Sequence, residues 1–286
     1  MSNTKVFIIG DTFLPQLDGG ERERNVIEKR DIVFEAYFPI TNTRLQLCKN
    51  INVRFSPFEG SDKPVIKNGQ LLDIENGEFL LKMFDGVHTH VKNIIIDGIY
   101  IQSESFMDRR ILTDKESEYM SYIAEHIKNV NKAFEMFGKE LKKFLVFELE
   151  KLEIRARCHD ASKLSEYEFG GYRRNFYPDA GELPSNESFE RAWLHHYRFN
   201  PHHPEFHNDF SQKVTFPMPD IDIAEMFIDW CAMSMKFGGR PDIWFKNKGR
   251  YTLHLNKKTE EKIFDILNNF NWDLWKDVCH CGKNAG

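Results

Sequence analysis

Histidine is concentrated in the second half of the chain. Six of the eleven histidines lie between positions 159 and 207, namely His159, His195, His196, His202, His203 and His207. Neutral imidazole is a common ligand of divalent transition metals. The segment Asn200–Pro204, however, has the composition of a surface turn, and a polar loop can collect histidines without binding a metal. The clustering alone therefore leaves a metal site and an exposed loop as alternatives.

Four residues occupy positions that favour the metal site. His126 lies on the apolar stripe of a helix predicted to begin near position 113, and His159 and Asp160 close the apolar stripe of a second helix. Asp229 lies within Ala224–Met235, a helical segment that is apolar almost all round. Burying a carboxylate is costly unless it is paired, hydrogen-bonded or bound to a cation. A mixture of imidazole and carboxylate favours Mn, Fe, Co, Ni or Zn over Ca, so we expect one or two divalent transition-metal ions.

Each of these residues also has an ordinary structural interpretation. A single histidine on an apolar helix face usually satisfies its ring nitrogens inside the core. Asp229 could form an ion pair with Arg155 or Arg157 instead of binding a metal. Separate stretches of sequence that all direct such side chains inwards are harder to explain in this way. We therefore predict that the four residues meet around a cation in the interior of a helical bundle.

The composition limits what such a site can act on. The 286 residues are 41% hydrophobic and 29% charged, which is typical of a globular protein of one or two domains. A net charge of −5 and the lack of a long basic run argue against binding long nucleic acids, which requires many phosphate contacts. The sequence contains no run of about 18 apolar residues, which is the length needed to span a membrane. Five scattered cysteines fit a reducing compartment, so we expect a cytoplasmic protein. Because long nucleic acids are disfavoured, we expect the substrate to be a small molecule.

The elements that must position the site divide the chain in two. Residues 1–112 are β-rich, and Asx-Gly pairs that begin at Asn68, Asn76, Asp85 and Asp97 have the form of tight turns. The expected strands are Val6–Ile9, Ile32–Phe38, Ile51–Phe55, Gly77–Met83 and Val91–Ile101. The role of this region does not follow from its sequence.

A helical period begins at position 113, where Thr113–Glu116 has the form of a capping box. Further helices are expected over Glu140–Ser162, Glu187–Phe199, Asp220–Gly238 and Lys258–Asn269, with a looser segment around Gly170-Gly171 and a short hairpin over Lys246–Leu255. The predicted class is α+β, with an all-α bundle over residues 113–286 after the β-rich region.

The order of the four residues resembles that of the HD metal-dependent phosphohydrolases. That superfamily carries a histidine, then a His-Asp pair, then a late aspartate on a helical bundle, and here the pattern reads His126, His159-Asp160, Asp229. The stretch His159–Lys163 is similar to the His-Asp-x-x-Lys form of several HD branches, including the cyclic-dinucleotide phosphodiesterases. The resemblance implies an HD-like bundle in which a metal-activated water attacks a nucleotide or a related phosphoester.

Roughly residues 115–245 also resemble an uncharacterised family of phage and bacterial proteins. Its motifs are His-Asp-x-Ser-Lys, then His-His-x3-Asn-Pro-His-His-Pro-Glu, then Ala-Glu-Met and a helix rich in Trp and Met. In this chain these segments are His159–Lys163, His195–Glu205 and Ala224–Phe237. This second resemblance implies no activity. If a phage encodes the protein, the expected location is the host cytoplasm.

The HD resemblance also implies roles for individual residues. The four residues above would hold a first metal, and Asp160 would bridge to a second metal served by His195 or His196. Because adjacent helical residues point about 100° apart, we assign His195 to the metal and His196 to the substrate. Lys163, one turn beyond the His-Asp pair, would act with Asp160 in catalysis by donating to a phosphate oxygen. The remaining substrate-binding candidates are Tyr167, Arg173, Arg174 and Lys236, each of which fits a solvated surface equally well.

Two alternative functions stay open. Di-iron HD proteins such as myo-inositol oxygenase use a similar His/Asp set and also have a lysine after His-Asp, so an oxygenase is the first alternative. The second is a non-catalytic protein that binds or sequesters a nucleotide. The sequence does not identify the base, the number of phosphates, the metal or the oligomeric state, and a homo-oligomer is compatible with it.

Two smaller groups of histidine and cysteine have simpler interpretations. Cys279-His280-Cys281 lacks the second ligand pair of a structural zinc site, so we expect a disordered tail. His88 and His90 alternate along a predicted strand, and we expect them on its exposed face.

Overall fold

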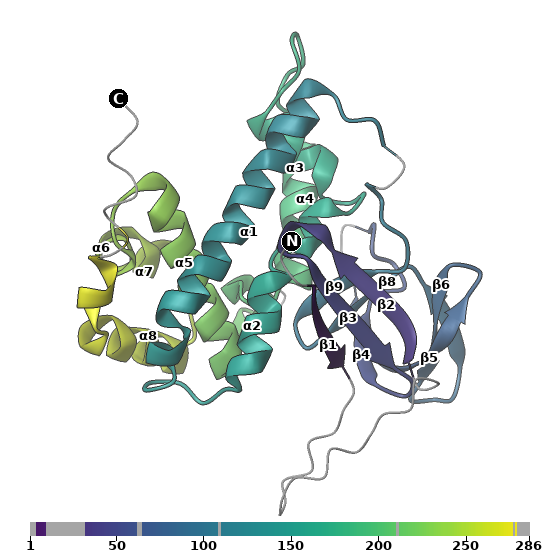
Figure 1. Cartoon of the computed structure of the whole chain (residues 1–286), viewed down its shortest axis with the longest axis horizontal. Helices are drawn as coiled ribbons and strands as arrows, with labels where there is room; N and C mark the ends of the chain where they lie inside the picture. The colour runs from purple at the N-terminus through teal and green to yellow at the C-terminus, as the bar shows by residue number, and fades with distance from the viewer. Residues whose placement is uncertain are drawn as a thin grey trace, which may run out of the picture. The chain divides into compact units, whose positions relative to one another are not determined.

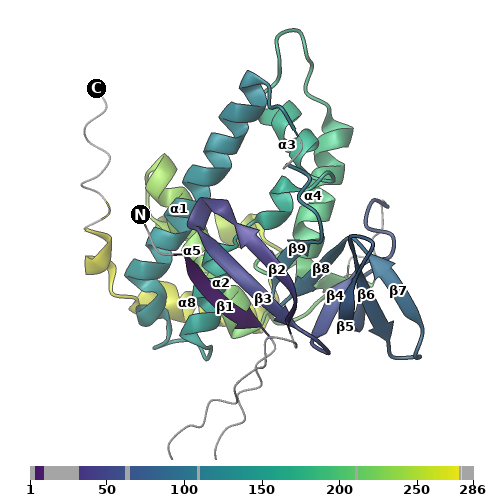
Figure 2. The same cartoon turned by 45° about the vertical axis from the view of Figure 1, so that its right-hand side comes forward.

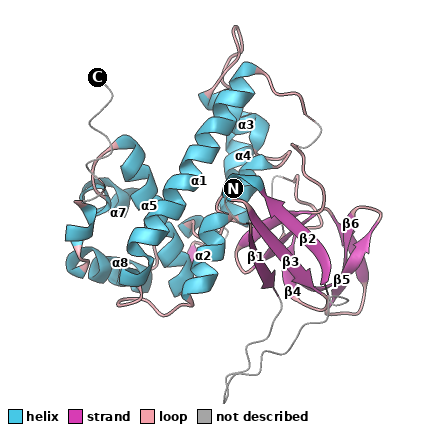
Figure 3. Ribbon diagram, in the orientation of Figure 1, coloured by secondary structure: helices cyan, strands magenta, loops and turns pink. Residues whose placement is uncertain are grey.

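The computed structural model describes residues 4–9, 32–61, 65–107, 110–209, 212–276 and 278. Strands dominate up to Gln102 and helices from Asp114 onwards. Figure 1 colours the chain by residue number, and Figure 3 colours the same view by secondary structure. The chain divides into two compact units, residues 1–109 and 110–286, close to the change of period in the sequence. The α+β class with a β-rich N-terminal region and a helical C-terminal region is confirmed.

Two β-sheets make up the first unit. Its strands are β1 (Lys5–Ile9), β2 (Ile32–Phe38), β3 (Thr43–Cys48), β4 (Asn52–Phe55), β5 (Lys67–Glu75), β6 (Glu78–Met83), β7 (His88–Val91), β8 (Asn93–Ile96) and β9 (Ile99–Gln102). One sheet has the order β1-β3-β2, with β1 parallel to β3, and the other is antiparallel with the order β7-β6-β5-β4-β8-β9 (Figure 2). Strand β2 lies against β5 of the larger sheet, and the rings of Phe34 and Phe79 meet edge to face at 5.0 Å between centroids.

The Asx-Gly signals identify some turns correctly and one wrongly. Asn76-Gly77 and Asp97-Gly98 each supply two positive φ angles at a hairpin turn, as a type I′ turn requires. The second of these divides the expected strand Val91–Ile101 into β8 and β9. The turn predicted at Asn68-Gly69 is wrong, because both residues lie within β5, where Gly69 is paired with strands on both sides.

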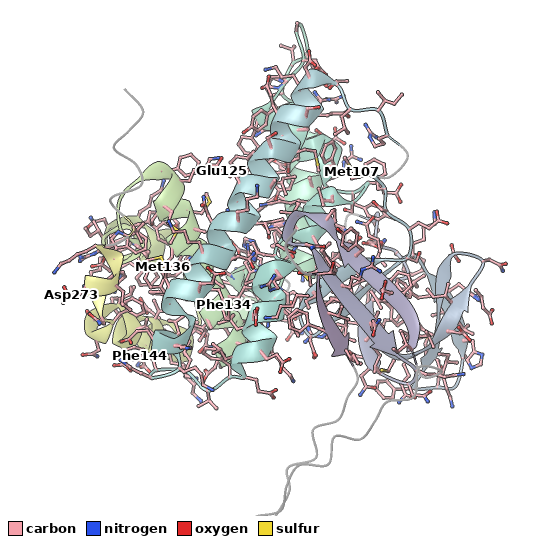
Figure 4. The ribbon with its side chains drawn as sticks, viewed as in Figure 1. Met107, Glu125, Phe134, Met136, Phe144 and Asp273 are labelled. Carbon is pink, nitrogen blue, oxygen red and sulfur yellow. The ribbon has the colours of Figure 1, made fainter. Side chains whose placement is uncertain are left out.

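A helical bundle forms the second unit. Its helices are α1 (Asp114–Leu141), α2 (Leu149–Arg157), α3 (Phe169–Phe176), α4 (Asn186–Phe199), α5 (Asp220–Phe237), α6 (Pro241–Trp244), α7 (Arg250–Thr252) and α8 (Lys257–Asn269), with two short strands, β10 (Asn208–Asp209) and β11 (Val214–Thr215). The predicted capping box is confirmed, since the Thr113 and Glu116 side chains each accept a hydrogen bond from the other's backbone. Helix α1 packs along α5 and α2 (Figure 1). Phe134, Met136 and Phe144, labelled in Figure 4, pack against the core between these helices.

Three predicted elements of this unit are wrong in part. The helix expected over Glu140–Ser162 is interrupted, because α1 ends at Leu141 and α2 covers only Leu149–Arg157. The segment expected to be loose around Gly170-Gly171 contains α3. The hairpin expected over Lys246–Leu255 is replaced by a π-helical turn and α7. The helical spacing of apolar residues continues in the sequence across such interruptions, so that spacing alone did not show where the helices end.

The structure describes one of the two smaller motifs. His88 and His90 are exposed on β7, and the ring of His90 lies 3.1 Å from Glu75. Cys279, His280 and Cys281 lie outside the described residues. Across the ranges that the structure describes, none of the helices combines the length and the apolar character needed to cross a membrane.

Candidate metal centre

Three elements of the helical unit bring the four predicted residues together. His126 comes from α1, His159 and Asp160 from the turn after α2, and Asp229 from α5. His126 Nε2 lies 3.2 Å from Asp229 Oδ1 and 3.6 Å from Asp160 Oδ2. His159 Nε2 lies 3.8 Å from Asp229 Oδ1 and 3.6 Å from Asp160 Oδ1. We call His126, His159 and Asp229 the first metal group, because their ligand atoms all lie within 4.8 Å of one another.

A second set of ligand atoms faces Asp160 from α4 and the turn that follows it. His196 Nε2 lies 3.4 Å from Asp160 Oδ1, and His202 Nε2 lies 3.5 Å from the same oxygen. Asp160, His196, His202 and His203 form the second metal group, again with ligand atoms within 4.8 Å of one another. Asp160 therefore contacts the imidazoles of both groups.

The backbone at Asp160 explains why both residues of the His-Asp pair face the cluster. Helix α2 ends at Arg157, so His159 and Asp160 lie in a turn and the 100° spacing of a helix does not apply to them. Asp160 has φ 54° and ψ 26°, a left-handed conformation that aspartate tolerates better than most residues. The unusual conformation directs the Asp160 carboxylate between the two metal groups.

The spacing of these atoms fits ligands of a shared cation better than direct hydrogen bonds. Nitrogen–oxygen hydrogen bonds are about 2.7–3.2 Å long, whereas most of the ring-to-carboxylate distances here are 3.4–3.8 Å. Atoms that each lie about 2.0–2.2 Å from one metal ion are roughly 3–3.6 Å apart. In the described part of the chain, four of these atoms are buried without a hydrogen-bond partner: His159 Nε2, His202 Nε2, Asp160 Oδ1 and Asp229 Oδ1. Such atoms are rare in native proteins, and ions bound by the two metal groups would satisfy all four.

Ion pairs elsewhere in the cluster remove the ordinary explanation for Asp229. Arg155 donates to Asp222 and to Glu225, with 2.6 Å between the atoms in each case. Arg157 pairs with a glutamate of its own helix at 3.0 Å. The two arginines therefore contact other carboxylates, while Asp229 faces imidazoles. A buried carboxylate that faces imidazoles can pair with a protonated ring or serve as a ligand of a metal ion.

Electrostatic coupling holds a proton in the metal-free cluster. Burial disfavours the charged form of His159, but Asp160, Asp229 and Glu225 raise its pKa to about 10. Burial also opposes ionisation of Asp160 and Asp229, yet the neighbouring imidazoles hold the pKa of both carboxyls well below the usual range. Burial, followed by repulsion from His196, lowers the pKa of His203 to about 3. A metal that binds His159 must therefore displace a proton.

Glu168 contacts both adjacent histidines of α4, and the Nε2 atoms of the two rings distinguish them. Its carboxylate is fully buried and accepts from His195 Nδ1 at 2.6 Å and from His196 Nδ1 at 2.8 Å. The Nε2 atom of His196 points at Asp160, whereas His195 belongs to neither metal group. The structure thus places His196, and not His195, among the residues that could hold a metal, whereas helical geometry gave His195 to the metal and His196 to the substrate.

Cations and an aromatic ring border the partly exposed side of the cluster. The side chains of Asp229, Lys163 and Lys236 are 17%, 15% and 19% exposed. Lys163 Nζ lies 2.6 Å from Asp160 Oδ2. Lys236 Nζ lies 4.4 Å from the centroid of the Tyr122 ring, which is parallel to the His126 ring, and Lys236 also pairs with Glu125.

The other three substrate-binding candidates point elsewhere. Arg173 and Arg174 lie on α3 and not on the expected loop, and both pair with Glu182. Arg173 also lies 3.0 Å from Asp179. The ring of Tyr167 stacks on that of His195, with 5.1 Å between centroids. In this structure the two arginines are engaged by carboxylates and are not directed at the metal groups.

The sequence did not assign a metal-binding role to four residues of the cluster. For the segment that carries His202 and His203, a metal site and a surface turn stayed open as alternatives, and the structure buries His202 and places both residues in the second metal group. Glu168 and Glu225 were not singled out at all. A signal for Glu225 was available, because it is a charged residue in the apolar segment Ala224–Met235. Glu168 carries no comparable signal in the sequence.

Comparison with known proteins identifies the family but not an activity. Residues 115–271 match the Family of unknown function (DUF5662), and this match covers more than half of the chain, so the chain belongs to that family. No curated protein and no solved structure shows significant similarity to the chain. The matched segment contains both metal groups.

Proposed function

We propose that the protein is an HD-type metal-dependent phosphohydrolase that uses two divalent ions to hydrolyse a nucleotide or a related phosphoester. The observation that carries the proposal is that four buried atoms, which have no hydrogen-bond partner among the described residues, lie together at distances suited to metal ligands. The order His126, His159-Asp160, Asp229 along the chain adds the resemblance to HD enzymes.

The donor atoms suit divalent transition metals. His126, His159 and Asp229 would hold one ion, and His196, His202 and His203 a second, with Asp160 shared between them. Imidazole and carboxylate ligands favour Mn, Fe, Co, Ni or Zn. Ions bound at such a site supply hydroxide at neutral pH and polarise the phosphoryl oxygen.

Lys163 and Lys236 support an anionic substrate. Both ammonium groups lie on the partly exposed side of the cluster, one beside Asp160 and the other over the Tyr122 ring. An incoming phosphate would replace Asp160 or Glu125 as the partner of a lysine, and each lysine would then orient a non-bridging oxygen. The half-buried ring of Tyr122 gives the base of a nucleotide an aromatic surface to contact.

Metal analysis followed by a nucleotide-panel assay tests the proposal. The purified protein is expected to retain one or two equivalents of a transition metal and to release phosphate from at least one nucleotide. Asp160→Ala should lose both properties, while Asp265→Ala, a change at an exposed position of α8, should lose neither.

Four results would contradict the hydrolase. One is a wild-type protein that binds no metal, and another is unchanged phosphate release by Asp160→Ala. Two bound irons with an optical band that responds to oxygen would indicate the oxygenase instead. Metal and nucleotide binding without turnover would identify a sequestering protein.

A further inference from the structure

We infer that Glu225 is a positioning residue shared by both metal groups, because one of its carboxylate oxygens faces the Nδ1 atom of a histidine of each. Glu225 Oε1 lies 2.9 Å from His159 Nδ1, within hydrogen-bond distance, and 3.5 Å from His202 Nδ1, where the contact is electrostatic. His159 belongs to the first metal group and His202 to the second, and their ring centroids are 4.4 Å apart. This inference rests on the proposed metal centre.

The opposite nitrogen of each ring faces the candidate metal positions. The Nε2 atoms of His159 and His202 lie 3.6 Å and 3.5 Å from Asp160 Oδ1, and neither has a hydrogen-bond partner among the described residues. A neutral imidazole carries its proton on one nitrogen only. A carboxylate that accepts at Nδ1 keeps the proton there and leaves the Nε2 lone pair free for a metal.

Arg155 determines which oxygen of Glu225 faces the histidines. Arg155 Nε donates to Glu225 Oε2 at 2.6 Å, and its Nη1 donates to Asp222 Oδ1 at 2.6 Å. The other oxygen of Asp222 lies 3.3 Å from His207 Nε2. Arginine has no acceptor, so Oε2 must remain an acceptor and Oε1 is left for the two imidazoles. The buried Arg155–Glu225 pair thus fixes the geometry at both metal groups.

Glu225→Gln tests this arrangement with a change of few atoms. The amide oxygen must face Arg155, because an amide NH2 there would oppose the guanidinium donors. The NH2 group then points at both Nδ1 atoms and donates to them. Each ring is forced to carry its proton on Nε2, where it blocks metal binding. The expected result is weaker binding of both ions.

Glu168→Gln is the matched comparison. Glu168 bonds the Nδ1 atoms of His195 and His196, and only His196 belongs to a metal group. This variant should therefore weaken the binding of one ion and leave the binding of the other unchanged. Glu182→Gln removes a carboxylate that pairs with Arg173 and Arg174, outside both groups, and should weaken neither.

The experiment is a Co²⁺ titration of the metal-free full-length protein, followed by visible absorption and by calorimetry. Loss of an outer carboxylate that orients a ligand typically costs about 10- to 100-fold in metal affinity. We expect a loss of that size for both ions in Glu225→Gln, for one ion in Glu168→Gln and for none in Glu182→Gln.

Circular dichroism establishes whether each variant is folded. If Glu225→Gln does not fold, Glu225→Asp is used, because it keeps the charge beside Arg155 while withdrawing the carboxylate from the histidines. It too should weaken both ions. The inference would be overturned if the folded Glu225 variant bound only one ion more weakly, or bound both as tightly as the wild type. The hydrolase proposal would still stand. A wild-type protein that binds no Co²⁺ would overturn both.

Discussion

Raising the pH should destabilise the metal-free protein and leave the metal-loaded protein unaffected. The pKa of His159 is raised to about 10 in the folded metal-free state, mainly by Asp160 acting against burial, compared with an ordinary value of 6.5. A raised pKa contributes stability that is complete below pH 6.5 and is lost as the pH rises towards 10. Metal binding takes the proton from His159 in the folded state, so this loss should disappear in the loaded protein.

The expected slope follows from the number of protons bound. Between pH 7.5 and 8.5 the folded metal-free state keeps the His159 proton and the unfolded state has lost it. One proton corresponds to about 1.4 kcal/mol for each pH unit. The free energy of unfolding should therefore fall by about 1.4 kcal/mol over this interval without metal. His159 is buried, so solvent screening does not reduce this value appreciably.

Urea unfolding at the two pH values, with a chelator or with saturating metal, measures the difference. All five tryptophans lie beyond position 190, so their fluorescence reports the helical unit. When the pH slopes of the metal-free and the metal-loaded protein are compared, the contributions of groups that titrate in the same way in both cancel. His159→Gln provides the matched variant, whose metal-free form should lose the slope. Equal slopes with and without metal, or an unchanged slope in His159→Gln, would refute the assignment of the proton to His159.

Two further changes test the reaction and the packing around the site. Lys163→Met removes the ammonium group beside Asp160, and we expect phosphate release to fall by about 100-fold or more while the metal content of the protein is kept; an unchanged rate would exclude Lys163 from catalysis. Gly171→Ala would place a Cβ 2.5 Å from the Ser188 carbonyl oxygen, where α3 packs on α4, and should lower the free energy of unfolding in urea by about 1–3 kcal/mol. Gly170→Ala, whose Cβ would meet no atom within 4 Å, is the control and should not lower it.

The division of the chain into a β-rich and a helical region could be predicted from local sequence patterns. The capping box at Thr113–Glu116 is a short-range signal, and the structure contains both of its hydrogen bonds. The turns at Asn76-Gly77 and Asp97-Gly98 are likewise local, because the dipeptide itself favours the required φ angles. Asn68-Gly69 shows the limit of this reasoning, since pairing with β4 and β6 holds the same kind of dipeptide within a strand.

Residue chemistry alone indicated which side chains would gather in one buried cluster that could hold a metal. His126, His159, Asp160 and Asp229 are ionisable or metal-binding types at apolar helix positions, and burial of such groups requires a partner wherever the helices pack. That argument depends on amino-acid type and period, both of which are written in the sequence. Their order along the chain added the resemblance to HD enzymes.

Tertiary structure decided how the individual atoms are used. The left-handed turn at Asp160 brings both residues of the His-Asp pair to the cluster, and a helical period could not predict it. His196 Nε2 faces Asp160 whereas His195 belongs to neither metal group, and the turn after α4 carries His202 and His203 to the cluster. Glu225 can act on His159 and His202 together only because α5 packs beside two segments distant in sequence. Contacts of this kind depend on distances of a few tenths of an ångström, which packing fixes and residue spacing does not.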